Sequence, residues 1–224
     1  MTKPRALVSW SSGKDSAWML HVLRQQAEVE IVGLVTTFNE AFNRVAMHAV
    51  RRELVDAQAR EAGLPLWPVQ LPWPCTNAMY EERMRALIES ARAQGVTAFA
   101  FGDLFLEDIR AYRERQLAGT GMTPLFPIWS SEKETSNLAR EMQAGGLQAV
   151  LTCIDPRHLT PDFAGRHFDE ALLADLPATV DPCGERGEFH TFCYAGPMFK
   201  NPISIALGER VERDGFVFAD VDFS

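Results

Sequence analysis

The feature that most constrains this fold is a regular alternation of strand-like and helix-like segments in the first half of the chain. Short apolar runs alternate with stretches whose apolar residues recur at helical spacing, and glycine or proline ends several of the helices. The expected strands are 5–10, 31–38, 66–71, 97–101 and 125–129, and the expected helices are 15–27, 48–62, 77–94 and 107–117. This succession predicts a parallel sheet with helices on both faces.

The pattern changes after residue 129. A helix is expected over 131–144, a strand over 149–155 and a helical stretch over 166–173, within a loop-rich region. The segment 202–221 is expected to form a hairpin around Asp214-Gly215, a dipeptide that suits a tight turn. The sequence therefore predicts an α/β domain over 1–129 and a smaller C-terminal α/β domain over 130–224.

Composition excludes several classes of protein. The 30 acidic and 22 basic residues give a formal net charge of −8, which argues against a broad nucleic-acid or lipid-headgroup surface. No apolar run approaches the ~20 residues of a membrane span, and we expect no signal peptide. The four cysteines have no C-x-x-C spacing, so a zinc ribbon or redox pair is not expected. The expectation is a soluble protein of the reducing cytoplasm.

The connection after the first expected strand, residues 11–16, reads Ser-Ser-Gly-Lys-Asp-Ser and has the composition of an anion-binding loop. Small residues let the backbone curl so that its N–H groups converge, and the helix that follows adds its positive N-terminal end. Lys14 can add a charge, and Asp15 can hold Mg²⁺ or cap the helix. The loop is not a Walker A motif, because Val8 stands where that motif needs its first glycine. The alternative is an ordinary strand–helix turn.

Two further segments follow expected strands. His48 opens a helix and would face a ligand at the sheet edge; the alternative is a solvated residue at a helix start. Gly102 permits close approach at another strand end, and Asp103 beside it can hold Mg²⁺. Arg110 and Arg113 lie one helical turn apart and can clamp a phosphate or carboxylate. The alternative for this segment is a solvated, charged helix.

The run 183–192 is the densest group of chemically active residue types in the chain. Two glycines bracket Glu185 and Arg186, and Glu188 and His190 are two residues apart. In an extended segment this spacing points both side chains to one side. A carboxylate and an imidazole on one side suit acid–base work or substrate orientation. The alternative is a surface loop that enters a strand.

These segments together resemble a known family. Residues 11–16 resemble the S-G-G-x-D-S pyrophosphate loop of the PP-loop (N-type) ATP pyrophosphatases, with Ser12 in place of the first glycine. Further matches are M-H at Met47-His48, G-D-L-F-L-E-D-I-R from Gly102, P-L-F-P-I-W from Pro124 and G-E-R-G-E-F-H-T-F from Gly184. In this order, and over most of its length, the chain is similar to the diphthine–ammonia ligase (diphthamide synthetase) family of PP-loop enzymes.

The resemblance implies a PP-loop ATP-binding domain of Rossmann type followed by the smaller domain. It implies a ligase that adenylates a carboxylate with ATP, releases pyrophosphate, and lets ammonia displace AMP. The implied cofactors are ATP and Mg²⁺, and the implied partners are ammonium and a carboxylate acceptor such as a translation factor. Nucleic acid and membrane are not expected partners, and a homodimer is left open.

The resemblance and the residues together define the expected site. The residues expected to bind the nucleotide are Ser11, Ser12, Gly13, Lys14, Asp15, Ser16, His48, Gly102 and Asp103, with Asp15 and Asp103 as Mg²⁺ ligands. The residues expected to serve catalysis are Glu185, Glu188, His190, Arg110 and Arg113.

Two alternatives remain open. One is RNA sulfur transfer, which other PP-loop proteins perform, but the cysteine spacing and the acidic balance disfavour it. The other is a nucleotide sensor without enzymatic activity, which would not need an intact cluster of Glu185, Glu188 and His190.

Overall fold

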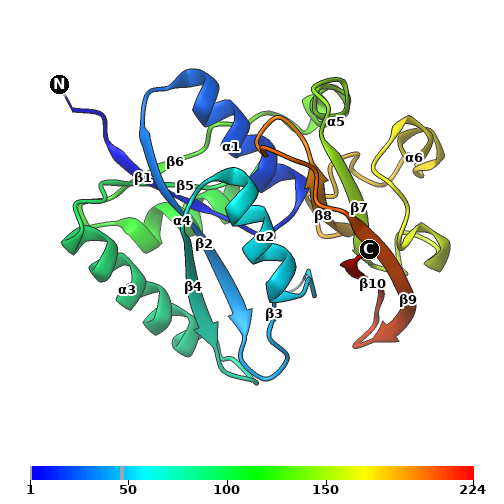
Figure 1. The fold of residues 1–224 in the computed structure, drawn as a ribbon, viewed down its shortest axis with the longest axis horizontal. Helices are drawn as coiled ribbons and strands as arrows, with labels where there is room; N and C mark the ends of the chain where they lie inside the picture. The colour runs from blue at the N-terminus through cyan, green and yellow to red at the C-terminus, as the bar shows by residue number, and fades with distance from the viewer. Residues whose placement is uncertain (1, 46–47) are drawn as a thin grey trace.

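Two β-sheets lie side by side in the computed structural model, which describes residues 2–45 and 48–224 (Figure 1). The first sheet is mostly parallel and contains β1 (Arg5–Ser9), β2 (Glu30–Asn39), β3 (Arg44–Val45), β4 (Leu66–Leu71), β5 (Ala98–Ala100) and β6 (Thr123–Leu125). The second sheet is antiparallel and contains β7 (Gln148–Ile154), β8 (Phe189–Ala195), β9 (Ile205–Arg213) and β10 (Phe216–Phe223). The chain therefore has a parallel α/β unit followed by a smaller antiparallel one, and we propose that the two divide near residue 129.

The parallel strands of the first sheet lie in the order β4-β2-β1-β5-β6, and β3 pairs antiparallel with the end of β2. The chain thus builds outward from β1 through β2 and β4, and then returns to the other side of β1 with β5 and β6. In open sheets of this kind, ligands bind outside the carboxyl ends of the strands where the order reverses. The ends of β1 and β5 are therefore the first place to look for a site.

Helices cover both faces of the first sheet. The helices of the first half are α1 (Lys14–Gln26), α2 (Arg52–Ala62), α3 (Asn77–Ala93) and α4 (Glu107–Leu117). Helices α5 (Thr135–Ala144) and α6 (Glu170–Asp175) belong to the second half and lie beside its sheet (Figure 1). Buried residues of α1 and α2 share one hydrophobic cluster with the second sheet, whereas buried residues of α3 share another cluster with the opposite face. Leu7 and Val8 of β1 belong to different clusters, as the alternation along a buried strand requires. Among the described residues, no helix is both long and apolar enough to cross a bilayer.

The expected elements are largely present, and β4 and α4 have the bounds that the sequence predicts. Helix α2 begins at Arg52 rather than at His48, because Arg44 and Arg51 form a β-bridge that closes a turn before the helix. The strand expected at 125–129 lies earlier in the chain. Strand β6 ends at Leu125, and Trp129 closes a turn by donating its N–H to the carbonyl oxygen of Phe126.

The second half departs further from prediction. Helix α6 covers 170–175 instead of 166–173, because Asp169 caps its first turn by accepting the N–H of Leu172 at 2.8 Å. The residues before it are extended, and Phe168 donates its N–H to Ala149 of β7. Strand β8 was not among the expected strands. Met47 lies outside the described residues.

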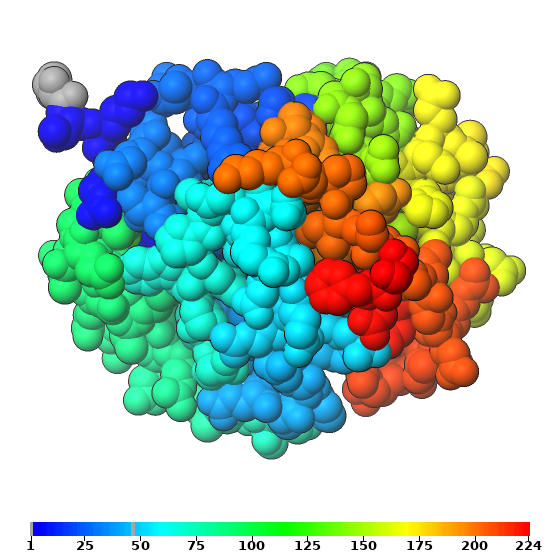
Figure 2. Space-filling view, in the orientation of Figure 1, coloured from blue at the N-terminus to red at the C-terminus, as the bar shows by residue number. Residues whose placement is uncertain are grey.

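A fully buried amide, Gln58 of α2, ties the two halves together. Its side-chain oxygen accepts the indole N–H of Trp10 at 2.8 Å, and its nitrogen donates to the carbonyl oxygens of Ser12 at 2.9 Å and Cys193 at 2.6 Å. The N–H of Cys193 also donates to the Ser12 oxygen, at 2.9 Å. Strand β8 is thus fixed to the loop after β1, and the atoms around α2 abut those around β8 at the surface (Figure 2).

Replacement of Gln58 by leucine should be strongly destabilising. The variant leaves the Trp10 indole without its acceptor and removes a donor from two buried carbonyl oxygens, which predicts a loss of roughly 2–5 kcal/mol in the free energy of unfolding. Urea titration followed by fluorescence measures it. The control is Gln143→Leu, because the amide atoms of Gln143 are buried with no hydrogen-bond partner among the described residues. The control should change stability little, and equal losses in both variants would contradict the role given to Gln58.

Candidate active site

A cleft of about 690 Å³ lies at the carboxyl ends of β1 and β5, where the strand order reverses. Its volume falls in the range typical of small-molecule sites. The predicted site residues that line it are Ser11, Lys14, Asp15, Ser16, His48, Gly102, Asp103, Arg113, Glu185 and His190. The cleft therefore collects residues from both halves of the chain.

The loop 11–16 curls tightly before α1. Ser12 is fully buried and has a φ of 71°, in the left-handed region that glycine occupies more easily. The N–H of Lys14 donates to the hydroxyl of Thr191, on β8, at 3.0 Å. The first hydrogen bond within α1 runs from the N–H of Ala17 to the carbonyl oxygen of Gly13. The N–H groups of Asp15 and Ser16 come before it, so the helix provides them with no acceptor. These two groups and the helix dipole suit an anion.

Lys14 is buried, and its charge is directed into the protein. Its Nζ donates to the two carboxylate oxygens of Asp15 at 2.9 and 2.8 Å and to the carbonyl oxygen of Cys183. The rings of Phe168 and Phe189 each lie 5.5 Å from it. Burial disfavours the charged form of both groups and raises the pKa of Asp15. For Lys14, the surrounding acidic groups, with Asp15 first among them, together outweigh the cost of burial and hold its pKa above the ordinary value. Lys14 is therefore an internal cation that orients Asp15, rather than a free charge in the cleft.

Three carboxyl groups face the cleft from different segments. Asp15 lies at the start of α1, Asp103 accepts from the Nε of Arg113 at 3.3 Å, and Glu185 accepts the N–H of Leu104 at 2.8 Å. Burial, together with the charges of Asp15 and Asp103, raises the pKa of Glu185 to about 8 against the lowering effect of its hydrogen bond. At neutral pH the Glu185 carboxyl is therefore mostly protonated.

The chemistry of these groups fits Mg²⁺ held jointly with a ligand. Among the residues described, no three His, Cys, Asp or Glu side chains are arranged to hold a metal ion by themselves. Mg²⁺ in nucleotide sites ordinarily takes only one or two protein carboxylates, and phosphate oxygens and water complete its coordination. Asp15 and Asp103 supply that number, and a nearby cation would favour ionised Glu185.

Close approach explains the glycine after β5. A Cβ on Gly102 would lie 3.3 Å from the backbone carbon of Asp15 and from the backbone nitrogen of Ser16. Because backbone atoms cannot turn aside as a flexible side chain can, a side chain here would push the end of β5 away from the start of α1. Gly102 therefore lets the two strand ends build one cleft.

Two imidazoles from different halves meet in the cleft. The rings of His48 and His190 are 4.6 Å apart, centroid to centroid. Nδ1 of His48 lies 3.2 Å from the carbonyl oxygen of Thr191, which can only accept, so Nδ1 carries the proton and Nε2 is an acceptor. Burial lowers the pKa of His48 to about 3 and that of His190 to about 4, with the charge of Lys14 contributing to both. Both rings are therefore neutral at physiological pH.

The expected partnership of Glu188 with His190 was wrong. Glu188 is buried, and its two oxygens accept the N–H groups of Asp181 and Arg186, each at 3.0 Å. The extended segment begins only at Phe189, so the same-side rule for residues two apart does not reach back to Glu188. Its carboxylate holds the turn that carries Glu185.

The two predicted arginines have different surroundings. Arg113 lies in the cleft wall beside Asp103 and over the ring of Phe101. Arg110 pairs with Glu114 at 3.0 Å and stacks on aromatic rings that follow β6. Arg110 is not among the described residues that line the cleft, and its ion pair with Glu114 is a local contact of the kind expected on a charged helix. Ser12 and Gly13 form the rear of the loop and do not line the cleft either.

Sequence reasoning missed the groups that join the loop to β8. Thr191 caps the Lys14 N–H, Gln58 bridges the two segments, and the Cys183 carbonyl receives Lys14. Thr191 was within the densest motif, but its role depends on a partner 177 residues away. No local pattern marks such a contact.

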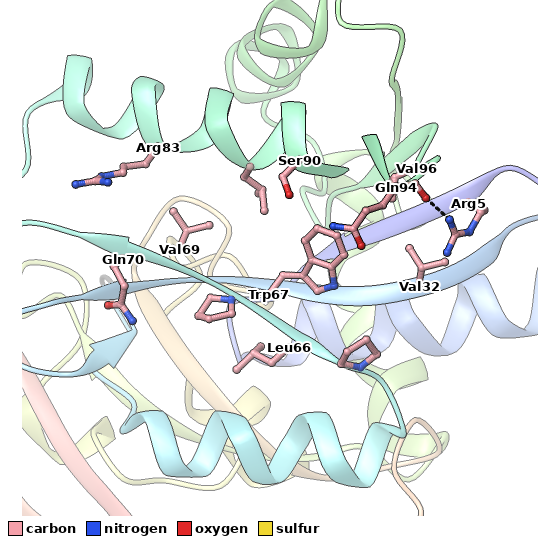
Figure 3. A pocket seen from close by; sticks show the side chains of 13 residues that line it. Arg5, Val32, Leu66, Trp67, Val69, Gln70, Arg83, Ser90, Gln94 and Val96 are labelled. Atoms are coloured by element: carbon pink, nitrogen blue, oxygen red, sulfur yellow. Dashed lines mark hydrogen bonds between the residues drawn. The ribbon is translucent and has the colours of Figure 1, made fainter. Parts of the chain in front are cut away.

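A second groove, of about 750 Å³, lies between β4 and α3 (Figure 3). Trp67 and Val69 of β4 face it, and Arg5 donates across one end to the carbonyl oxygen of Gln94. Its described lining includes no acidic or histidine side chain. The groups suited to acid–base or metal chemistry are therefore found in the first cleft.

The raised pKa of Glu185 predicts a specific pH dependence. The folded chain keeps a proton that the unfolded chain releases, so the free energy of unfolding falls as pH rises from the ordinary pKa of 4.5 to about 8. The amide of Glu185→Gln keeps an oxygen that can accept the Leu104 N–H, but it does not titrate in the folded or the unfolded chain. We expect its stability relative to the parent to increase across this window, by at most about 1.4 kcal/mol per pH unit.

Urea titrations of both proteins across the same window provide the measurement. His48 and His190 contribute below their ordinary pKa of 6.5, but both are present in both proteins, so their effects cancel in the difference. A difference in stability that is constant with pH would show that Glu185 is ionised in the folded protein.

Comparison with known proteins agrees with this arrangement. Residues 4–124 match the diphthamide synthase N-terminal domain, and residues 134–221 match the diphthamide synthase C-terminal domain. The diphthine–ammonia ligase of Danio rerio is 26% identical over 238 residues, which cover 95% of this chain and 91% of that protein. The Homo sapiens and Mus musculus proteins of the same name are 29% and 26% identical, over 63% of this chain and 53% of their own length. With both family domains present in order, this chain belongs to the diphthamide synthase family.

Proposed function

We propose that this chain is an ATP-dependent ligase that converts a carboxylate into an amide. The carboxylate attacks the α-phosphorus of ATP and releases pyrophosphate, and ammonia then displaces AMP from the acyl adenylate. The observation that carries the proposal is the curled loop 11–16 at the strand-order reversal, which shares one cleft with the neutral imidazoles of His48 and His190. Family membership supports the use of ATP.

The first half of the chain would hold the nucleotide. The N–H groups of Asp15 and Ser16 suit phosphate oxygens, and Arg113 adds a positive charge on the facing wall. The remaining wall is largely apolar and suits a flat base; it includes Val35, Leu71, Tyr80, Met84 and Phe101. Mg²⁺, when bound, would offset the charge of the phosphates, with Asp15 and Asp103 as its protein ligands.

His48 and His190 would serve the second step. Ammonium must lose a proton before its nitrogen can attack, and a neutral imidazole can accept it. Nucleotide phosphates in the cleft would favour protonated imidazole, which raises the low pKa of both rings during the reaction. Glu188 acts at a distance, because it fixes the turn before β8 rather than contacting the reactants.

The acceptor is proposed from the relatives. The name of the relatives identifies diphthine as the acceptor of those proteins. For this chain we propose a carboxylate of the same class, carried by a translation factor or a smaller molecule. Sulfur transfer fits poorly, because three of the four cysteines are buried, burial raises the pKa of Cys153 to about 12, and no cysteine is among the described lining of the cleft.

The proposed chemistry predicts the nucleotide products. Incubation with ATP, Mg²⁺, ammonium and a suitable carboxylate should yield AMP and pyrophosphate, because attack occurs at the α-phosphorus. Nucleotide chromatography with a pyrophosphate assay measures both. Asp15→Ala should bind ATP weakly and form neither product, and release of ADP and phosphate alone would reject adenylation.

A second prediction separates the two steps. His190→Ala should bind ATP within a few-fold of the parent but lose roughly 10²–10⁴-fold in ammonium-dependent turnover, because it removes a positioned proton acceptor. Calorimetry measures the affinity, and amide formation measures the turnover. The matched control is His167→Ala, since His167 contacts Tyr194 away from the cleft. Normal turnover of His190→Ala, or a loss of ATP affinity as large as that of Asp15→Ala, would refute this role.

A further inference from the structure

Strand β9 forms an outer edge of the second sheet. The strands lie in the order β8-β7-β10-β9, so β9 pairs with β10 on one side only and runs along the periphery of the molecule (Figure 1). Eight of its nine residues are exposed, including the large apolar residues Leu207 and Val211, at 45% and 51%. A long exposed edge can pair with another strand unless the sequence prevents it.

The hairpin geometry shows which main-chain groups face outward. Asp214 and Gly215 have φ values of 52° and 81°, as in a two-residue type I′ turn. Such a turn makes Arg213 and Phe216 a hydrogen-bonded pair, and the alternation then makes Val211 and Phe218 the next one. The N–H and C=O groups of Arg210 and Glu212 therefore point away from β10, toward the open edge.

The charges along this edge are complementary to themselves. Residues 209–213 read Glu-Arg-Val-Glu-Arg. When the segment is placed antiparallel to a copy of itself with Val211 opposite Val211, Glu209 lies opposite Arg213 and Arg210 lies opposite Glu212. All four charged positions then face the opposite charge, and cross-strand pairs of this kind stabilise a sheet. Charges on an edge strand usually discourage pairing, but this order favours one partner.

The same charges disfavour the neighbouring registers. If Glu209 or Glu212 lay opposite its own copy, two glutamates would face each other. If Arg210 lay opposite its own copy, two arginines would face each other. Like charges directly opposite are destabilising. The register centred on Val211 also makes Arg210 and Glu212 the hydrogen-bonded pair, which agrees with the outward direction of their main-chain groups.

We propose that β9 pairs antiparallel with β9 of a second copy of this chain, about a two-fold axis at Val211. The two four-stranded sheets become one sheet of eight strands. The guanidinium of Arg213 lies over the rings of Phe42 and Phe218, at 5.9 and 4.9 Å. The ion pairs at the edge do not oppose pairing: Arg210 meets exposed Asp162 at 3.2 Å, and Arg213 meets its neighbour Asp214 at 3.8 Å. Exposed ion pairs of this kind contribute little to stability, so they can be replaced by pairs between the two copies. The proposal does not depend on the proposed ligase activity.

Charge exchange within the edge tests the proposal on the full chain. Arg210→Glu places glutamate opposite glutamate twice in the dimer and should weaken association at least about tenfold. The double variant Arg210→Glu/Glu212→Arg exchanges the two signs, restores both opposite-charge pairs, and should return the dissociation constant to within a few-fold of the parent. Sedimentation velocity over a concentration series measures the dissociation constants.

Two further variants complete the test. Val211→Lys places like charges on the axis and should also weaken the dimer, while circular dichroism should show an unchanged fold because Val211 is exposed. Arg85→Glu makes the same charge change on an exposed position of α3 and should leave association unchanged. A parent chain that sediments as a monomer at all concentrations overturns the proposal. So does a dimer that Arg210→Glu leaves intact, or one that the double variant fails to restore.

Discussion

The contact between β8 and the loop 11–16, which follows β1, is the interaction on which the rest of the structure depends. The Ser12 carbonyl oxygen accepts from both Cys193 and Gln58, and Thr191 caps the N–H of Lys14. Ser12 needs this support, because an L-residue in the left-handed region costs roughly 1–2 kcal/mol. The curled conformation of the loop 11–16 is therefore a product of both halves of the chain. A defect in β8 should affect the loop 11–16 as well as His190.

The balance of charges in the cleft depends on the same contact between β8 and the loop 11–16. Lys14 is held by Asp15 and the Cys183 carbonyl, Arg113 pairs with Asp103, and burial keeps the imidazoles neutral and Glu185 mostly protonated. The cleft is thus close to neutral without a ligand. A polyphosphate would bring excess negative charge to it, so a divalent cation that enters with the phosphates would benefit both the ligand and the three carboxyl groups.

The sequence predicted features whose causes are local. The bounds of β4 and α4 follow from residues within those segments. The loop at Ser12 and the glycine at position 102 were marked by residue type alone, and the contacts that explain them come from β8 and from the start of α1. Arg110 and Arg113 show the limit, because helical spacing places them alike and only their distant neighbours, the rings after β6 and Asp103, distinguish their roles. Glu188 shows the same limit, since its role depends on where β8 begins. Gln58 joins segments 46 and 135 residues away, for which the sequence gives no signal.

The edge strand shows how topology gives meaning to a charge pattern. The order Glu-Arg-Val-Glu-Arg is visible in the sequence, but it has a consequence only because β9 ends the sheet and leaves the main chain of Arg210 and Glu212 facing outward. Strand β10 then connects this edge to the first half, since Asp220 binds both Arg44 and Arg51 beside the turn that carries His48. A sheet extended through β9 would restrain β10, and through these ion pairs it would restrain one wall of the cleft. Pairing at the edge and order at the site are therefore linked by one short path of contacts.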